Sequence, residues 1–230
     1  MTPEATLILD FDGTVCLGHD PVRDYARRVT SLLDRTAADQ FRKVFNAFLD
    51  GRPMTASTFD AYDPYHVVTI LARENGVGDA ERRSIFADVR EKLGRGEYAV
   101  RTPAKFDQLI FSLPKTVEVV LATQAPATGM DGALDHLGLD GLFDEVHYDA
   151  GKPEGIGAMI DKRLGDMEPS QILCVGDIPA NDLAAAVERG CPTAYIDHFG
   201  RPWSKASVSA RDLADLYRFI DKWALAATTV

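Results

Sequence analysis

The feature that most constrains the fold is residues 7–14, with the sequence LILDFDGT. Three consecutive apolar residues predict a strand buried on both faces, which is typical of a parallel sheet. Asp10 and Asp12 follow where that strand ends, and open α/β sheets bind their ligands beyond the carboxyl ends of their strands. Residues two apart in an extended segment point to the same side, so the two carboxylates converge. Because neighbouring carboxylates repel, the pair predicts a cation or a shared proton.

Composition excludes several classes of protein. The 230 residues include 25 Lys and Arg against 35 Asp and Glu, a net charge of −10, and nucleic-acid binders usually show a basic footprint instead. Cys16, Cys174 and Cys191 are an odd number without CxxC spacing, which argues against a disulfide framework and structural zinc. The sequence has neither the basic start of a signal peptide nor an apolar run long enough to suggest a membrane span. We therefore expect a cytoplasmic protein that binds neither nucleic acid nor membrane. We expect it to be a monomer or a homodimer.

The hydrophobic pattern divides the chain into two predicted domains. Between about residues 20 and 98 the spacing is helical, and we expect helices at 20–34, 37–49, 64–75 and 80–93. Later strand-like runs at 117–121, 143–147, 172–175 and 193–196 alternate with helix-like segments at 127–137, 155–164 and 181–189, before a last helix at 211–225. This alternation predicts an α/β fold, with a Rossmann-like parallel sheet over 1–16 and 103–230 and an inserted α-helical domain over 17–102.

Four short segments lie where strands end or loops begin in the α/β half. They are the Asp10–Thr14 segment, Thr123-Gln124, Gly151-Lys152-Pro153 and the segment from Gly176-Asp177 to Asp182. Each alone is more often a turn or a helix cap than a site. All four in one chain, in positions where α/β proteins carry their sites, point to a single active site.

The acidic residues among them fit phosphoryl transfer, in which a protein mainly positions groups and neutralises charge. Mg²⁺ prefers hard oxygen ligands, and we expect Asp10, Asp177 and a carbonyl from the first loop, which contains Asp12, at the metal. A carboxylate nucleophile such as Asp10 forms an acyl phosphate and divides one difficult step into two. Asp12 can protonate the leaving alkoxide and later activate water.

The remaining segments supply contacts to phosphate. Lys152 offers a compact positive charge, and Thr123 offers a hydroxyl donor. Backbone N–H groups around Gly13 and Gln124 are expected to complete the phosphate site.

In this order, the four segments resemble the haloacid dehalogenase-like hydrolase superfamily, in its phosphatase branch, over roughly residues 5–15 and 103–200. The resemblance implies that Asp10 is the nucleophile and Asp12 the general acid and base. It also implies that Asp177 is the main further Mg²⁺ ligand, and that Asp182 binds the metal through water or orients Lys152. The superfamily places a helical cap between its first two motifs, where this chain has its strand-free block.

The resemblance also narrows the reaction. Relatives that cleave carbon–halogen bonds lack a carboxylate at the position of Asp12, and phosphonate-cleaving members have a small residue there. We therefore expect a Mg²⁺-dependent phosphatase acting on a small phosphorylated metabolite through an aspartyl-phosphate intermediate. A phosphosugar mutase of the same superfamily and a non-enzymatic phospho-receiver module are the alternatives. One residue departs from the pattern of the superfamily, since Gln124 stands where relatives often have Asn or Gly. In the helical block, the loop at 50–53 is a candidate for substrate selection, with Arg52 meeting an anionic group of the substrate.

Overall fold

The computed structural model describes residues 2–52, 58–59 and 61–229. The chain forms two compact units, each continuous in space but not in sequence. The first comprises Met1–Leu17, Arg101–Ala127 and Leu137–Val230, and the second comprises Gly18–Val100 and Thr128–His136.

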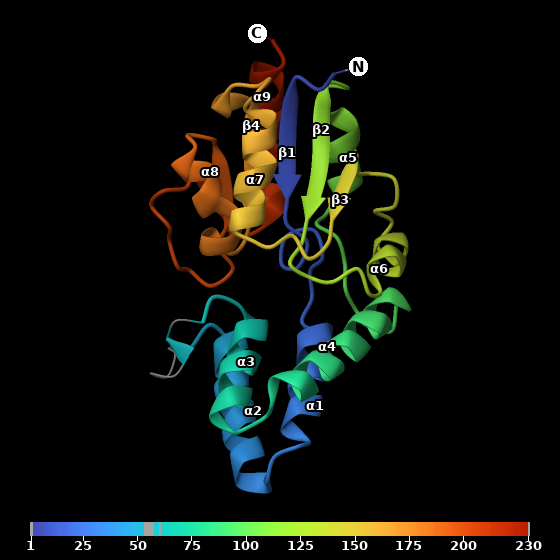
Figure 1. Cartoon of the computed structure of the whole chain (residues 1–230), viewed down its shortest axis with the longest axis vertical. Coiled ribbons are helices and arrows are strands. Elements are labelled where there is room, and N and C mark those ends of the chain that lie inside the picture. Colours follow the sequence, from blue (N-terminus) through green and yellow to red (C-terminus); the bar gives the residue numbers. More distant parts are fainter. Residues whose placement is uncertain (1, 53–57, 60, 230) are drawn as a thin grey trace. The chain divides into compact units, whose positions relative to one another are not determined.

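Within the described residues, the first unit is built around a six-stranded parallel sheet with the order β3-β2-β1-β4-β5-β6 (Figure 1). The strands are β1 (Ala5–Leu9), β2 (Val117–Ala122), β3 (Glu145–His147), β4 (Ile172–Gly176), β5 (Thr193–Ile196) and β6 (Val208–Ala210). Every residue of β1 and β4 is buried, as expected for central strands covered on both faces. Leu9 pairs with Leu121 of β2 and Val175 of β4, so the segments that follow these three strands emerge at the same edge.

Helices cover both faces of this sheet (Figure 1). They are α5 (Phe106–Ser112), α7 (Glu154–Arg163), α8 (Ala184–Glu188) and α9 (Tyr217–Ala227). In one buried cluster, Ile8 and Cys174 of the central strands pack with Ile156 and Ile160 of α7. The predicted α/β class with a Rossmann-like parallel sheet is confirmed.

Several elements differ from the sequence-based prediction. The helix expected over 181–189 is a π-helical turn, Pro179–Leu183, followed by the short α8. The edge strand β6 and the helix α5 were not predicted. Both are short, and the three residues of β6 are at most partly buried, so neither leaves a clear hydrophobic period in the sequence.

The second unit is helical in its described residues. Its helices are α1 (Asp20–Thr30), α2 (Arg35–Leu49), α3 (Pro64–Glu74), α4 (Asp79–Gly94) and α6 (Met130–His136). Aromatic rings contribute to its packing, since Phe86 meets Tyr25 and Tyr65 edge-on, with ring centroids 5.7 and 5.8 Å apart. No helix among the described residues is both long and apolar enough to span a membrane.

Two features of this unit bear on the predictions. The helix α6, expected to belong to the α/β domain, groups with α4 instead. In the loop proposed to select substrate, the guanidinium of Arg52 pairs with Asp50, and Pro53 lies outside the described residues.

Glycines allow the backbones of α4 and α6 to approach closely. A Cβ atom on Gly132 would lie 2.2 Å from the carbonyl oxygen of Gly94, and one on Gly129 would lie 2.1 Å from that of Arg90. These neighbours are backbone atoms, which a side-chain rotation does not move. The contact therefore depends on the absence of side chains at these positions.

We expect Gly132→Ala to lower the free energy of unfolding by about 1–3 kcal/mol, the usual cost of overpacking a buried contact. Urea denaturation followed by circular dichroism measures the change. Gly165→Ala is the matched control, because its Cβ would meet nothing closer than 3.9 Å. Equal stability of the two variants would contradict the close approach of α4 and α6.

Candidate active site

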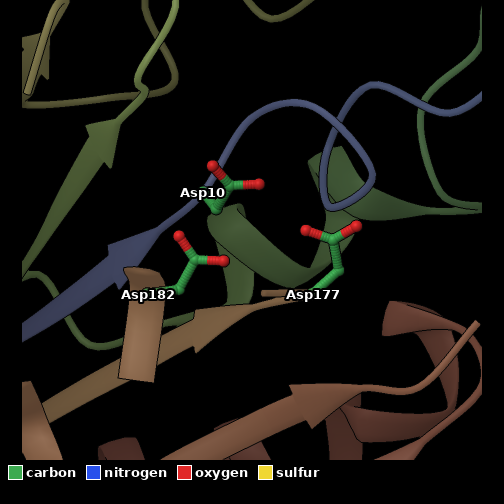
Figure 2. Close-up of side chains that lie close together, drawn as sticks. All are labelled: Asp10, Asp177 and Asp182. Atoms are coloured by element: carbon green, nitrogen blue, oxygen red, sulfur yellow. The ribbon is translucent and has the colours of Figure 1, made fainter. Parts of the chain in front are cut away.

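Three carboxylates gather beyond the carboxyl ends of the central strands (Figure 2). Asp10 directly follows β1, Asp177 directly follows β4, and Asp182 lies in the π-helical turn that comes next. One oxygen from each carboxylate lies within 4.8 Å of the others. The parallel register accounts for this meeting, because it brings the ends of β1 and β4 level with each other.

Lys152 is the cation within this cluster. Its Nζ donates to Oδ1 of Asp10 at 2.6 Å and to Oδ1 of Asp182 at 2.8 Å, and its side chain is only 2% exposed. Asp182 is held in turn by the backbone N–H of Ile178, which donates to its Oδ2 at 2.9 Å. The expectation that Asp182 orients Lys152 fits these contacts.

Burial and charge shift the titration of this pair. Burial, opposed by Lys152 and reinforced by Asp182, raises the pKa of Asp10 to about 7. Burial disfavours the Lys152 ammonium, but attraction to Asp10 and Asp182 outweighs it, so the pKa of Lys152 lies above its ordinary value. The Lys152 ammonium does not fully offset burial and the neighbouring carboxylates, so a further cation would favour the ionised form of Asp10.

The cluster fits a divalent cation. Its donor atoms are all carboxylate oxygens, the hard ligands that Mg²⁺ selects. Oδ2 of Asp10 is buried and has no hydrogen-bond partner in the described part of the chain, which fits a ligand position for such a cation. The prediction named Asp10, Asp177 and a carbonyl from the loop that contains Asp12, and the group of converging carboxylates contains Asp182 besides Asp10 and Asp177.

The loop after β1 differs in detail from the prediction. Backbone N–H groups around Gly13 were expected to bind phosphate, and the N–H of Gly13 itself donates to the carbonyl of Cys16 at 3.0 Å. Gly13 has a φ of +87°, and a Cβ atom there would lie 2.2 Å from Oδ2 of Asp177. This glycine therefore allows the loop to lie against Asp177. Asp12 is partly exposed and forms an isolated bridge with Cys16 in the same loop.

The two predicted phosphate ligands after β2 also lie at this edge of the sheet. The hydroxyl of Thr123 accepts from the N–H of Ala125 at 3.1 Å, which leaves its own hydrogen able to donate. The Gln124 side chain has a role the sequence did not indicate, since its Oε1 accepts from the backbone N–H of Lys152 at 3.0 Å. Gln124 thereby ties the loop that carries Lys152 to the end of β2.

His198 is a residue near the site that sequence reasoning missed. It follows β5, and its Nε2 lies 2.7 Å from the carbonyl oxygen of Gly13 and 3.9 Å from Oδ2 of Asp177. The five histidines of the chain have no metal-ligand spacing, so no local pattern marks it. The signal lies in the topology, because β5 is the neighbour of β4 and its carboxyl end reaches the same edge.

Comparison with protein-family models and with curated protein sequences gives no match. Solved structures, in contrast, match over nearly the whole chain. The YfnB protein of Bacillus subtilis, named as a HAD hydrolase and solved bound to magnesium, shares 19% sequence identity, with 96% of this chain and 100% of that chain covered and a TM-score of 0.63. A HAD phosphatase from Thermococcus onnurineus shares 21% identity, with 96% and 98% covered and a TM-score of 0.60.

A 2-haloacid dehalogenase from Pseudomonas syringae is also similar, with 17% identity, 97% of this chain and 100% of that chain covered, and a TM-score of 0.53. The chain therefore has the fold of the haloacid dehalogenase-like hydrolases, as the four segments predicted. Phosphatases and dehalogenases share this fold, so the reaction has to be argued from the site.

Replacing Lys152 should expose the repulsion within the carboxylate cluster. We expect Lys152→Met to lower the free energy of unfolding by about 3–5 kcal/mol near neutral pH, because a buried ion pair loses one partner. Mg²⁺ should restore part of the loss. Urea denaturation with and without Mg²⁺ tests this, with Lys162→Met as the control because Lys162 is exposed. Similar stability of the two variants would contradict the role given to Lys152.

Mg²⁺ binding should depend on pH through Asp10. Because its metal-free pKa is raised to about 7, the cation has to displace a proton at lower pH. We expect affinity to rise between about pH 5.5 and about pH 7.5 and then to level off. Without metal, it is the stability of the fold that depends on the titration of Asp10, and it changes with pH in the opposite direction. Folded Asp10 holds its proton at pH values where unfolded Asp10 has lost it. Its contribution to stability therefore falls as pH rises from the pKa of the unfolded state toward 7.

Calorimetry in buffers of different ionisation enthalpy measures the proton released per Mg²⁺ bound. Asp10→Asn is the control, since an amide has no proton to release at this position. Proton release that is the same in both proteins would assign the titration to another group.

Proposed function

We propose that this chain is a Mg²⁺-dependent phosphatase that hydrolyses a small phosphorylated metabolite through an aspartyl-phosphate on Asp10. The observation that carries the proposal is the position of Asp10. It is a buried carboxylate at the end of a central strand, 2.6 Å from Lys152 and grouped with Asp177 and Asp182. Carboxylates so placed next to a cation are suited to nucleophilic attack on a phosphoryl group.

Asp10 and Asp177, with Asp182 beside them, would hold the Mg²⁺. When bound, the cation neutralises charge on the phosphoryl oxygens and keeps Asp10 ionised. Lys152 contributes a second positive charge, and Thr123 contributes a hydroxyl donor. This local charge matters because a chain with a net charge of −10 repels a phosphorylated metabolite at a distance.

In the first step, a carboxylate oxygen of Asp10 attacks phosphorus, and the bond between phosphorus and the ester oxygen breaks. Asp12, in its protonated form, gives its proton to the leaving alkoxide, which departs as an alcohol. Asp10 now carries the phosphoryl group as a mixed anhydride.

In the second step, Asp12 takes a proton from water, and the water oxygen attacks phosphorus of the aspartyl-phosphate. The bond to Asp10 breaks, inorganic phosphate forms, and Asp12 is again protonated. The sum is phosphate ester plus water giving alcohol plus phosphate, with both residues returned to their starting forms.

Asp12 supports a phosphatase over a dehalogenase. A halide leaves as a stable anion and needs no proton, whereas an alkoxide is a poor leaving group without one. A partly exposed carboxylate two residues from the nucleophile can donate the proton that an alkoxide needs and that a halide does not.

Variants of the two aspartates should stop the reaction at different stages. With Mg²⁺ and an aryl phosphate, Asp10→Asn should release no phenol. Asp12→Ala should release about one equivalent rapidly and then turn over about 10²- to 10⁴-fold more slowly than the natural protein, because the good leaving group departs unaided but water is not activated. Stopped-flow absorbance separates the burst from the steady state.

Asp161→Asn is the control, since this exposed residue pairs with Arg189 on the α/β unit, and it should behave as the natural protein. EDTA should abolish turnover in all active variants. Continued turnover by Asp10→Asn would overturn the nucleophile. A phosphoryl group that is returned to a sugar phosphate instead of to water would indicate a mutase, and an aspartyl-phosphate that persists would indicate a receiver module.

A further inference from the structure

We propose that His198 is a positioning residue of this site: it holds the loop after Asp10 against Asp177, and so sets the geometry of Asp12 and of the cation site. The inference rests on the proposed function for its effect on turnover, but its effect on cation binding is independent of any substrate. His198 lies on the loop after β5, outside the four segments that the sequence singled out.

The contact itself defines the state of the imidazole. Nε2 of His198 lies 2.7 Å from the carbonyl oxygen of Gly13, and a carbonyl oxygen only accepts hydrogen bonds. Nε2 therefore carries a hydrogen and donates it. This bond joins the loop after β5 to the loop after β1, over a separation of 185 residues in sequence, and β4 is the strand between β1 and β5 in the sheet.

The hydrogen bond from His198 restrains the second of the two peptide groups of Gly13. Its N–H donates to the carbonyl of Cys16 at 3.0 Å, and its carbonyl accepts from His198, so the peptide groups on both sides of Gly13 are held. Between these two peptide groups the φ of Gly13 is +87°, a conformation that glycine adopts as readily as many others. The hydrogen bond from His198 therefore helps to restrain a backbone that is otherwise free to change conformation.

Fixing Gly13 matters because of its two neighbours. Asp12 precedes it in the chain, so the direction of the Asp12 side chain follows the orientation of the shared peptide group. A Cβ on Gly13 would lie only 2.2 Å from Oδ2 of Asp177, so the backbone of the loop packs directly beside this carboxylate. His198 Nε2 is itself 3.9 Å from the same oxygen and closes the other side.

The loop that carries His198 is itself held in place. The N–H of Asp197 donates to Ala210 in β6 at 2.8 Å, and the carboxylate of Asp197 accepts from the N–H of Arg201 at 2.7 Å. The hydroxyl of Tyr195 donates to the carbonyl of Arg201 at 3.2 Å. These hydrogen bonds restrain the backbone of the loop, so that the His198 side chain is positioned to donate to Gly13.

Three substitutions separate positioning from mere stability. His198→Ala removes the donor. His198→Gln places an amide N–H near the position of Nε2, and His198→Asn places one near Nδ1, too short to reach Gly13. For each full-length variant, calorimetry gives the Kd for Mg²⁺, steady-state kinetics with an aryl phosphate give kcat and KM, and urea denaturation gives stability.

We expect His198→Ala and His198→Asn to bind Mg²⁺ about 10-fold more weakly and to lose about 10-fold in kcat, as is usual when a group supporting a metal ligand is removed. KM should change little, because the phosphate contacts are assigned to Lys152 and Thr123 and not to His198. His198→Gln should recover most of both losses. His147→Asn is the control, since the side chain of His147 pairs with Glu145 instead.

The Mg²⁺ affinities keep the two proposals apart. If no phosphate ester is hydrolysed but the order of Mg²⁺ affinities holds, the proposed function fails and the role of His198 stands. An Mg²⁺ affinity and a kcat unchanged in His198→Ala would overturn the inference. So would equal losses in the Ala, Asn and Gln variants that follow their loss of stability, because that result describes a structural residue only.

Discussion

The structure of the site depends on one interaction, the buried contact of the Lys152 ammonium with Asp10 and Asp182. Parallel pairing of β1 with β4 brings acidic side chains to the same edge of the sheet, and their mutual repulsion opposes folding unless positive charge accompanies them. Lys152 provides one charge, held in place by both carboxylates. Burial, together with the negative charge of Asp182, raises the pKa of Asp10 to about 7 even beside Lys152, and the remaining negative charge makes the cluster suited to a divalent cation. Stability and cation affinity thus have a common electrostatic origin.

The sequence predicted those parts of the fold in which a local pattern and the tertiary structure agree. The apolar runs of β1, β2 and β4 are fully or almost fully buried in the sheet, and β5 has the bounds expected for it. The position of Asp10, Asp177 and Lys152 around one point also followed, because the ends of parallel strands meet at one edge. The short elements α5 and β6 are too brief to impose a period, and a sequence pattern does not reveal them.

What the sequence did not predict depends on contacts between distant residues. The Gln124 side chain accepts from the backbone of Lys152, and His198 donates to the backbone of Gly13, neither of which leaves a residue pattern. The sequence predicted that N–H groups around Gly13 bind phosphate, and it gave no sign that the N–H of Gly13 itself is bonded within the turn, to the carbonyl of Cys16. The grouping of α6 with α4 also depends on a contact between distant residues. Gly94 and Gly132 allow the two helices to approach closely, but neither glycine indicates its partner in the sequence.

The donor count of Lys152 links the resting site to the proposed reaction. An ammonium has three N–H donors, and within the described residues two of them reach Asp10 and Asp182. The third can meet a phosphoryl oxygen while the contact with Asp10 persists, so the same charge that stabilises the nucleophile also attracts its target. In the proposed reaction, Asp10 would lose its negative charge on forming the phosphoryl bond, and the ammonium would then attract the transferred group instead. The Lys152 ammonium would therefore stabilise first the carboxylate of Asp10 and then the transferred phosphoryl group, while its ion pair with Asp182 keeps the lysine in place.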